Sequence, residues 1–105
     1  MIDMAQFYSS NGPERVGFLL KDGKVVEVEN IASDPLQAFQ VSADDLLKYE
    51  GKAAATWHTH PGATRNLSVA DYHTFLAWPE LEHYIIGSNG VRHYQVRDGE
   101  VYYAS

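Results

Sequence analysis

Short apolar runs separated by turn-forming residues dominate the hydrophobic pattern of this chain. Runs of roughly four to eight residues bounded by Gly, Asn and Asp are typical of strands. The dipeptides Asp22-Gly23, Asn89-Gly90 and Asp98-Gly99 favour tight hairpin turns between neighbouring strands. Phe39 and Val41 are expected to face inward from the strand predicted at residues 37–41. The pattern predicts strands at residues 16–20, 24–29, 37–41, 53–59, 82–86, 91–96 and 101–104.

Two segments carry helix signals among these strands. Ser42 can cap a helix that continues through Tyr49, and Ser68 can cap one that continues to about Trp78. Residues 2–9 are a short helix or an irregular lead-in. A chain that is mostly strand with two inserted helices predicts the α/β (α+β) class, with a curled mixed β-sheet flanked by helices. The inward stripe expected on the second helix consists of Val69, Tyr72, Phe75 and Leu76.

Composition narrows the classes of protein that this chain can be. Its 105 residues, 45% hydrophobic, suffice for one core, so we expect a single domain over residues 1–105. There is no apolar run near the roughly 18 residues of a membrane span and no signal-peptide pattern, so the expected location is cytoplasmic. A net charge of −6 argues against a nucleic-acid partner. With no cysteine, any metal must be held by histidine, carboxylate and water, which suits an open catalytic site.

The most informative pattern is His58-Thr59-His60, followed by Ser68 and Asp71. Two residues apart on a strand, His58 and His60 point to the same side. Asp71 lies one turn inside the following helix and can supply a third ligand. Three protein ligands with a fourth position kept for water are typical of catalytic zinc. We therefore predict one zinc ion held by His58, His60 and Asp71. The other histidines are expected on the surface: His73, His83 and His93.

A zinc hydrolase also needs a proton acceptor that is not a ligand, and Glu14 is the candidate. It precedes an apolar strand that should lie beside the histidine strand. Glu14 can also be read as an acidic residue in a first helical turn after Pro13, and Glu50 is its nearest rival. Ser68 likewise has two interpretations: a hydroxyl that stabilises a developing negative charge, or a plain N-cap.

Together, Glu14, His58-Thr59-His60-Pro61, Ser68 and Asp71 resemble the JAMM signature of the MPN+/JAB metalloproteases. The resemblance covers roughly residues 13–87. It implies a cytidine-deaminase-like JAB/MPN fold, zinc on the two histidines and the aspartate, water activation by Glu14, and a tetrahedral intermediate steadied by Ser68. It also implies hydrolysis of a peptide or isopeptide bond in an extended tail, such as that of a ubiquitin-like or sulfur-carrier protein.

The run Asn30–Pro35 resembles the JAB domain of bacteriophage tail assembly proteins, which makes phage tail components possible partners and the host cytoplasm or the virion the location. There is no room for the insertions that grip ubiquitin in eukaryotic members. The alternative function is a non-catalytic, zinc-stabilised tail-assembly or protein-interaction module. Nucleoside deaminases and His-Glu-x-x-His proteases are excluded because their signatures are absent.

Overall fold

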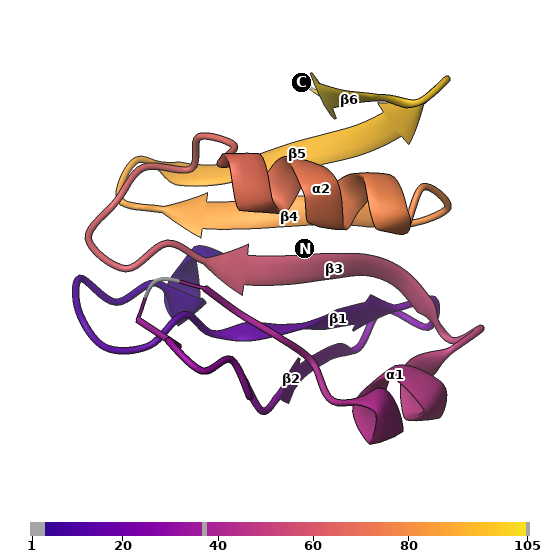
Figure 1. Cartoon of the computed structure of the whole chain (residues 1–105), viewed down its shortest axis with the longest axis horizontal. Coiled ribbons are helices and arrows are strands. Elements are labelled where there is room, and N and C mark those ends of the chain that lie inside the picture. Colours follow the sequence, from indigo (N-terminus) through magenta and orange to yellow (C-terminus); the bar gives the residue numbers. More distant parts are fainter. Residues whose placement is uncertain (1–3, 37, 105) are drawn as a thin grey trace.

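The computed structural model describes residues 4–36 and 38–104 and has an α+β fold in which six strands form one mixed sheet (Figure 1). The strands are β1 (Val16–Leu20), β2 (Val25–Val28), β3 (Ala53–Thr59), β4 (Glu82–Gly87), β5 (Gly90–Arg97) and β6 (Glu100–Ala104). The helices are the 3-10 helix η1 (Met4–Phe7), α1 (Ala43–Tyr49) and α2 (Val69–Ala77). Among these residues, none of the helices has the length and apolar character needed to cross a membrane.

The order of strands across the sheet is β2-β1-β3-β4-β5-β6. Every neighbouring pair is antiparallel except β3 and β4, which run parallel. A parallel pair needs a crossover connection, and here α2 supplies it. The chain therefore leaves the carboxyl end of β3 and enters α2 at the same edge of the molecule.

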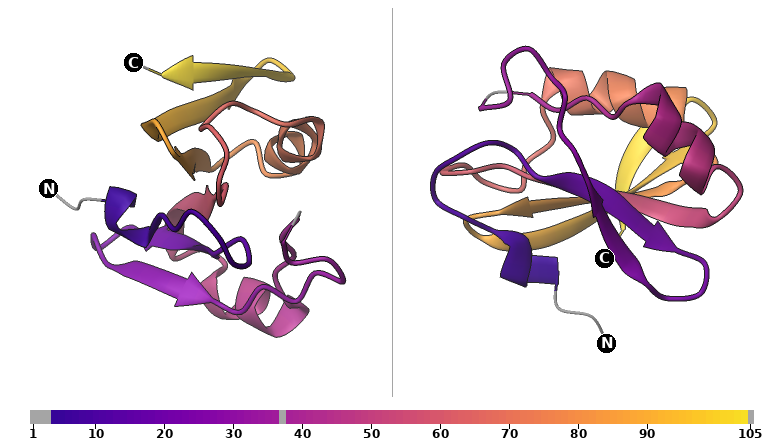
Figure 2. Two further views of the ribbon diagram at one scale, coloured as in Figure 1. Left: turned by 90° about the vertical axis from the view of Figure 1, so that its left-hand side faces the viewer. Right: turned by 90° about the horizontal axis from the view of Figure 1, so that it is seen from below.

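The two α-helices lie on one face of the sheet, and η1 lies on the other (Figure 2). Side chains alternate along each strand, so neighbouring residues contribute to different layers. On the helix face, Phe18 and Ile85 belong to buried clusters that pack against the two helices. On the opposite face, Trp57 is fully buried, as expected for a core residue, and stacks on Phe7 with ring centroids 4.4 Å apart.

The sheet differs from the expected one in two respects. It is not strongly curled: over the described strands a single register shift, between Leu19 and Leu20, interrupts the pairing, whereas strong curvature needs repeated bulges or glycine kinks. The strand expected at residues 37–41 is also wrong over residues 38–41, and Gln37 lies outside the described residues. Phe39 and Val41 nevertheless pack inward, as expected.

Helix α2 buries a different stripe from the one expected. Phe75 is fully buried, but Val69 is 76% exposed. The reason is Asp71, which is buried one turn before Phe75 and therefore occupies the inward-facing position at the start of the helix. Val69 precedes Asp71 by two residues, about 200° around the helix, so it points to solvent.

His83 is buried beneath α2, which corrects its expected position on the surface. Its ring stacks on Phe75 with centroids 4.1 Å apart. Nδ1 lies 2.7 Å from Thr56 Oγ1 on β3, and Nε2 lies 3.1 Å from the Trp78 carbonyl at the end of α2. Because a carbonyl only accepts, Nε2–H donates to Trp78 and Nδ1 accepts from Thr56. This neutral imidazole thus joins the helix to the strand that carries His58.

This burial predicts a pH-dependent loss of stability. Burial lowers the pKa of His83 to about 4 from 6.5, against the opposing effect of the Trp78 carbonyl. As pH falls from 6.5 to 4, the unfolded chain binds a proton that the folded chain excludes, so stability present above pH 6.5 is lost. We expect His83 alone to remove about 3 kcal/mol over that range. Denaturant unfolding at pH 7 and pH 4 tests this, because His83→Asn should show a correspondingly smaller loss.

Candidate metal centre

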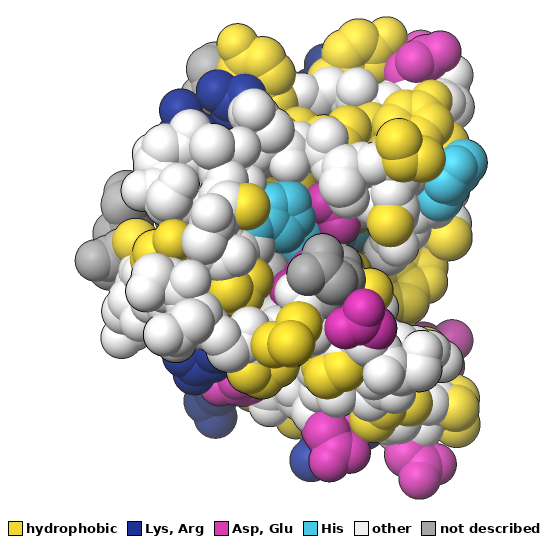
Figure 3. All heavy atoms as spheres, turned by 60° about the vertical axis from the view of Figure 1, so that its left-hand side comes forward, with side chains coloured by type: hydrophobic (Ala, Val, Ile, Leu, Met, Phe, Trp, Pro, Cys, Tyr) yellow, Lys and Arg dark blue, Asp and Glu magenta, His cyan; other side chains and the backbone are white. Residues whose placement is uncertain are grey.

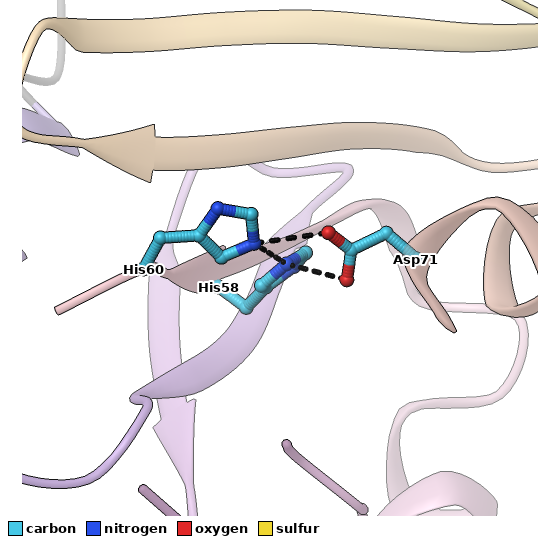
Figure 4. Close-up of side chains that lie close together, drawn as sticks. All are labelled: His58, His60 and Asp71. Carbon is cyan, nitrogen blue, oxygen red and sulfur yellow. Dashed lines mark hydrogen bonds and ion pairs between the residues drawn. The ribbon is translucent and has the colours of Figure 1, made fainter. Parts of the chain in front are cut away.

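The site lies where β3 ends and α2 begins. Paired with Val16 on one side and Ile85 on the other, His58 is centred in the sheet and faces α2. His60 follows the last residue of β3, and its backbone N–H donates to the Ile86 carbonyl, so the chain keeps its direction past the strand end. Asp71 enters from the first turn of α2, and the three side chains point toward one another (Figure 4).

The ligand atoms of these three residues have the spacing that a small cation requires. His58 Nε2 lies 3.0 Å from Asp71 Oδ1, and His60 Nε2 lies 2.9 Å from Asp71 Oδ2. The two Nε2 atoms are 3.1 Å apart. Ligands about 2.0–2.1 Å from a tetrahedral zinc ion lie roughly 3.3 Å from each other. A small outward movement of the side chains closes that difference, so the cluster could hold a metal ion.

The chemistry of the donor set fits a cation. His58 is 1% exposed and Asp71 is 4% exposed, so water does not solvate them. Two imidazole lone pairs and a carboxylate this close repel one another unless a proton or a metal ion lies between them. His60 Nδ1 donates to the Thr64 carbonyl at 2.8 Å, which leaves Nε2 of a neutral ring free as a ligand atom.

The pKa values of His58, His60 and Asp71 reflect their burial and their close approach to one another. Burial lowers the pKa of His58, and hydrogen bonding to Asp71 offsets this only in part. Burial also acts to lower the pKa of His60, but Asp71, the Thr64 carbonyl and Glu14 raise it above its ordinary value. Although burial alone would raise the pKa of Asp71, the two histidines hold it far below its usual range. Asp71 is therefore an ionised carboxylate at any pH where the histidines are metal ligands.

Glu14 and Ser68 border the same site. Together with Phe39 and Asp71 they line a small cavity of about 50 Å³. Histidine and acidic side chains lie next to one another near the middle of the face shown in Figure 3. Glu14 is 8% exposed, and its Oε1 has no hydrogen-bond partner among the residues that the structure describes. Burial, with a smaller contribution from Asp71 and against that of His60, raises its pKa to about 7. A base with a pKa near neutrality is what general acid–base catalysis uses.

Ser68 is the N-cap of α2, as one of its two interpretations predicted. Its Oγ accepts from the Asp71 backbone N–H at 3.1 Å, and Asp71 Oδ2 accepts from the Ser68 backbone N–H at 3.3 Å. This capping box fixes the Asp71 carboxylate as well as the helix end. The hydroxyl hydrogen of Ser68 is not used in the cap.

The other candidate residues, Glu50, His73 and His93, lie outside the cluster. Glu50 is the exposed C-cap of α1 and lines a separate groove of about 670 Å³ around the start of β3, so it is no rival to Glu14. His73 is exposed, as expected, and the half-buried His93 lies 3.3 Å from Glu82.

Sequence reasoning missed two contacts. The Phe39 ring lies against His58 with centroids 4.4 Å apart, and the Thr64 carbonyl orients His60. The inward apolar position of Phe39 was a signal for the first.

The cluster predicts zinc binding that depends on His60. We expect His60→Ala to weaken zinc affinity by more than about 100-fold, since outer partners of metal ligands alone are worth about 10- to 100-fold. His73→Ala, which removes an exposed histidine of α2, is the matched control and should leave affinity unchanged. Competition with a chromophoric chelator, together with metal analysis of the purified protein, measures both.

Protons should compete with zinc for the same nitrogens. Because the pKa of His60 is raised, we expect affinity to begin falling at a pH above about 6.5, histidine's ordinary pKa, and to fall further in more acidic solution. A zinc affinity that stays constant between pH 8 and pH 5.5 would contradict the assignment of His58 and His60 as ligands.

Comparisons with known proteins extend only to the fold. No protein-family model matches the chain, and no curated protein matches it. Among solved structures, the chain is similar to the solution structure of protein DSY2949 from Desulfitobacterium hafniense. The two share 19% sequence identity over 89% of this chain and 76% of that one, with a TM-score of 0.67. At this identity the likeness shows a shared fold and carries no information about activity.

Proposed function

We propose that this protein is a zinc-dependent peptidase of the JAMM (MPN+/JAB) type. The observation that carries the proposal is the buried cluster of His58, His60 and Asp71. Its Asp71 lines a small cavity together with the buried Glu14, whose Oε1 has no hydrogen-bond partner among the described residues. The JAB/MPN family has a cytidine-deaminase-like fold. A mixed sheet whose parallel pair is connected by a helix carrying the third ligand supports membership.

Each residue has a distinct role in the proposed reaction. His58, His60 and Asp71 would hold the ion. When bound there, zinc is a Lewis acid that lowers the pKa of water from 15.7 to about 7. Glu14 accepts the proton of the attacking water and passes it to the leaving amine, which its pKa of about 7 allows in both directions. Ser68 donates its free hydroxyl hydrogen to the carbonyl oxygen as negative charge develops there, a contribution typically worth about 2.7–4 kcal/mol.

The substrate we propose is an extended peptide, such as the flexible tail of a ubiquitin-like or sulfur-carrier protein. A cavity of about 50 Å³ beside the ligands has no space for folded structure or for a large side chain. Phage tail components remain candidate partners on the resemblance of residues 30–35.

A non-catalytic interaction module is the second candidate. In its favour, β6 is an edge strand of the sheet and presents the exposed rings of Tyr102 and Tyr103. Against it, a metal site that serves stability alone gains nothing from a neighbouring carboxyl whose burial raises its pKa and whose Oε1 lacks a partner. Perturbed carboxyls of this kind cluster at functional sites.

Replacing Glu14 separates the two functions. We expect Glu14→Gln to reduce peptide hydrolysis by about 10²- to 10⁴-fold while zinc content stays at the wild-type level. A library of extended fluorogenic peptides and co-expressed tailed partners provide the assay, and Glu50→Gln is the matched control that should keep full activity. Unchanged processing in Glu14→Gln would favour the interaction module.

The raised pKa of Glu14 also predicts how Glu14→Gln changes the melting temperature. Because the folded state resists ionisation of Glu14, the cost is absent below pH 4.5 and complete above about pH 7. In the metal-free protein at pH 8, Glu14→Gln should therefore melt at or above the wild-type temperature. A lower melting temperature would contradict the predicted cost of burying the Glu14 carboxylate.

A further inference from the structure

The loop of residues 61–66, here called the His60 loop, is attached at several points to the turn between β4 and β5. The Ser88 backbone N–H donates to the Ala63 carbonyl at 2.8 Å. The Arg65 backbone N–H donates to Asn89 Oδ1 at 3.0 Å. The Tyr94 hydroxyl donates to the Arg65 carbonyl at 3.0 Å. These bonds enclose Thr64, the residue whose carbonyl accepts from His60 Nδ1.

Gly87, the last residue of β4, provides the space for this attachment. A Cβ placed there would overlap the backbone nitrogen of Arg65 and the carbonyl carbon of Thr64. Both are backbone atoms, which cannot rotate away as the end of a side chain can. Any residue larger than glycine must therefore displace the Thr64 peptide, whose oxygen orients His60.

Tyr94 acts from the other side of the loop. Its side chain is 5% exposed and packs in the same cluster as Phe75 and Ile85. The ring is therefore held by the core beneath α2, and its hydroxyl presents a fixed donor to the Arg65 carbonyl. The loop contains no helix or strand, so its bonds to the sheet help to hold its position.

We propose that Gly87, Asn89 and Tyr94 are positioning residues that act through the Thr64 carbonyl to hold His60 protonated on Nδ1. With Nδ1 donating, the lone pair of the neutral ring lies on Nε2 and faces Asp71. Releasing the loop would let the ring rotate or change tautomer, which turns an N–H toward the ion. The inference rests on the proposed zinc centre, but it specifies how ligand geometry is set from the β4–β5 hairpin.

Two measurements test the proposal, and neither requires a substrate. The first is the ¹⁵N spectrum of the imidazoles in the metal-free protein, at an alkaline pH where His60 is neutral. It reports which nitrogen carries the proton. The second is zinc affinity by chelator competition. We expect Gly87→Ala to shift His60 toward the tautomer protonated on Nε2 and to weaken zinc binding by about 10- to 100-fold, the range typical of outer partners of metal ligands.

Gentler variants cover the case in which Gly87→Ala does not fold. Tyr94→Phe removes one hydroxyl from an otherwise unchanged core and should produce the same shift with a smaller loss of affinity. Asn89→Ala should do likewise, whereas Asn89→Asp keeps an oxygen acceptor for the Arg65 N–H and should restore wild-type behaviour.

A matched control separates positioning from general loss of stability. Tyr84→Phe removes the hydroxyl of a tyrosine that packs on the η1 face of the sheet. It should keep the His60 tautomer and zinc affinity. The proposal is overturned if folded Tyr94→Phe and Asn89→Ala retain both properties, or if Tyr84→Phe alters them equally. A wild-type protein that binds zinc without hydrolysing any peptide would overturn only the peptidase assignment.

Discussion

The parallel pairing of β3 with β4 is the constraint on which the rest of this structure depends. Parallel strands need a crossover, and the crossover helix α2 must start beside the end of the strand that precedes it. That geometry brings the first turn of α2 within 3.0 Å of His58, although Asp71 is distant from it in sequence. The capping box that begins the helix then orients the same carboxylate that completes the cluster. The capping box thus both begins α2 and positions the Asp71 carboxylate.

The helix face of the sheet carries several buried polar groups. His83 joins β3 to the end of α2, His58 and Asp71 meet at its beginning, and Glu14 closes the cavity. A buried polar group is costly unless it is paired. His83 is fully hydrogen-bonded and serves the fold, whereas Glu14 Oε1 and His58 Nδ1 have no hydrogen-bond partner among the described residues. Two of the buried polar atoms without a partner thus lie at the proposed reaction centre, where they reduce stability.

Attachment to the β4–β5 hairpin adds a second support for the candidate metal centre. The His60 loop has no regular structure, yet hydrogen bonds to Asn89 and Tyr94 hold it against Gly87. Loops that carry functional groups are commonly positioned by a rigid scaffold in this way. The β4–β5 hairpin is therefore part of the centre's architecture, although it supplies no ligand.

Local patterns in the sequence determined most strands, both helix starts and the three candidate ligands, because alternation, capping and a short ligand spacing act between near neighbours. They failed where distant segments compete for the same space. Val69 was expected inside, but the buried Asp71 took that face of α2, and His83 was expected outside, but α2 covers it. The contact of Phe39 with His58 and the support of His60 by Thr64 also arise only when the sheet brings remote segments together. The sequence named the chemistry of the site, and only the tertiary structure decided its surroundings, since burial and hydrogen-bond partners are properties of the packed chain.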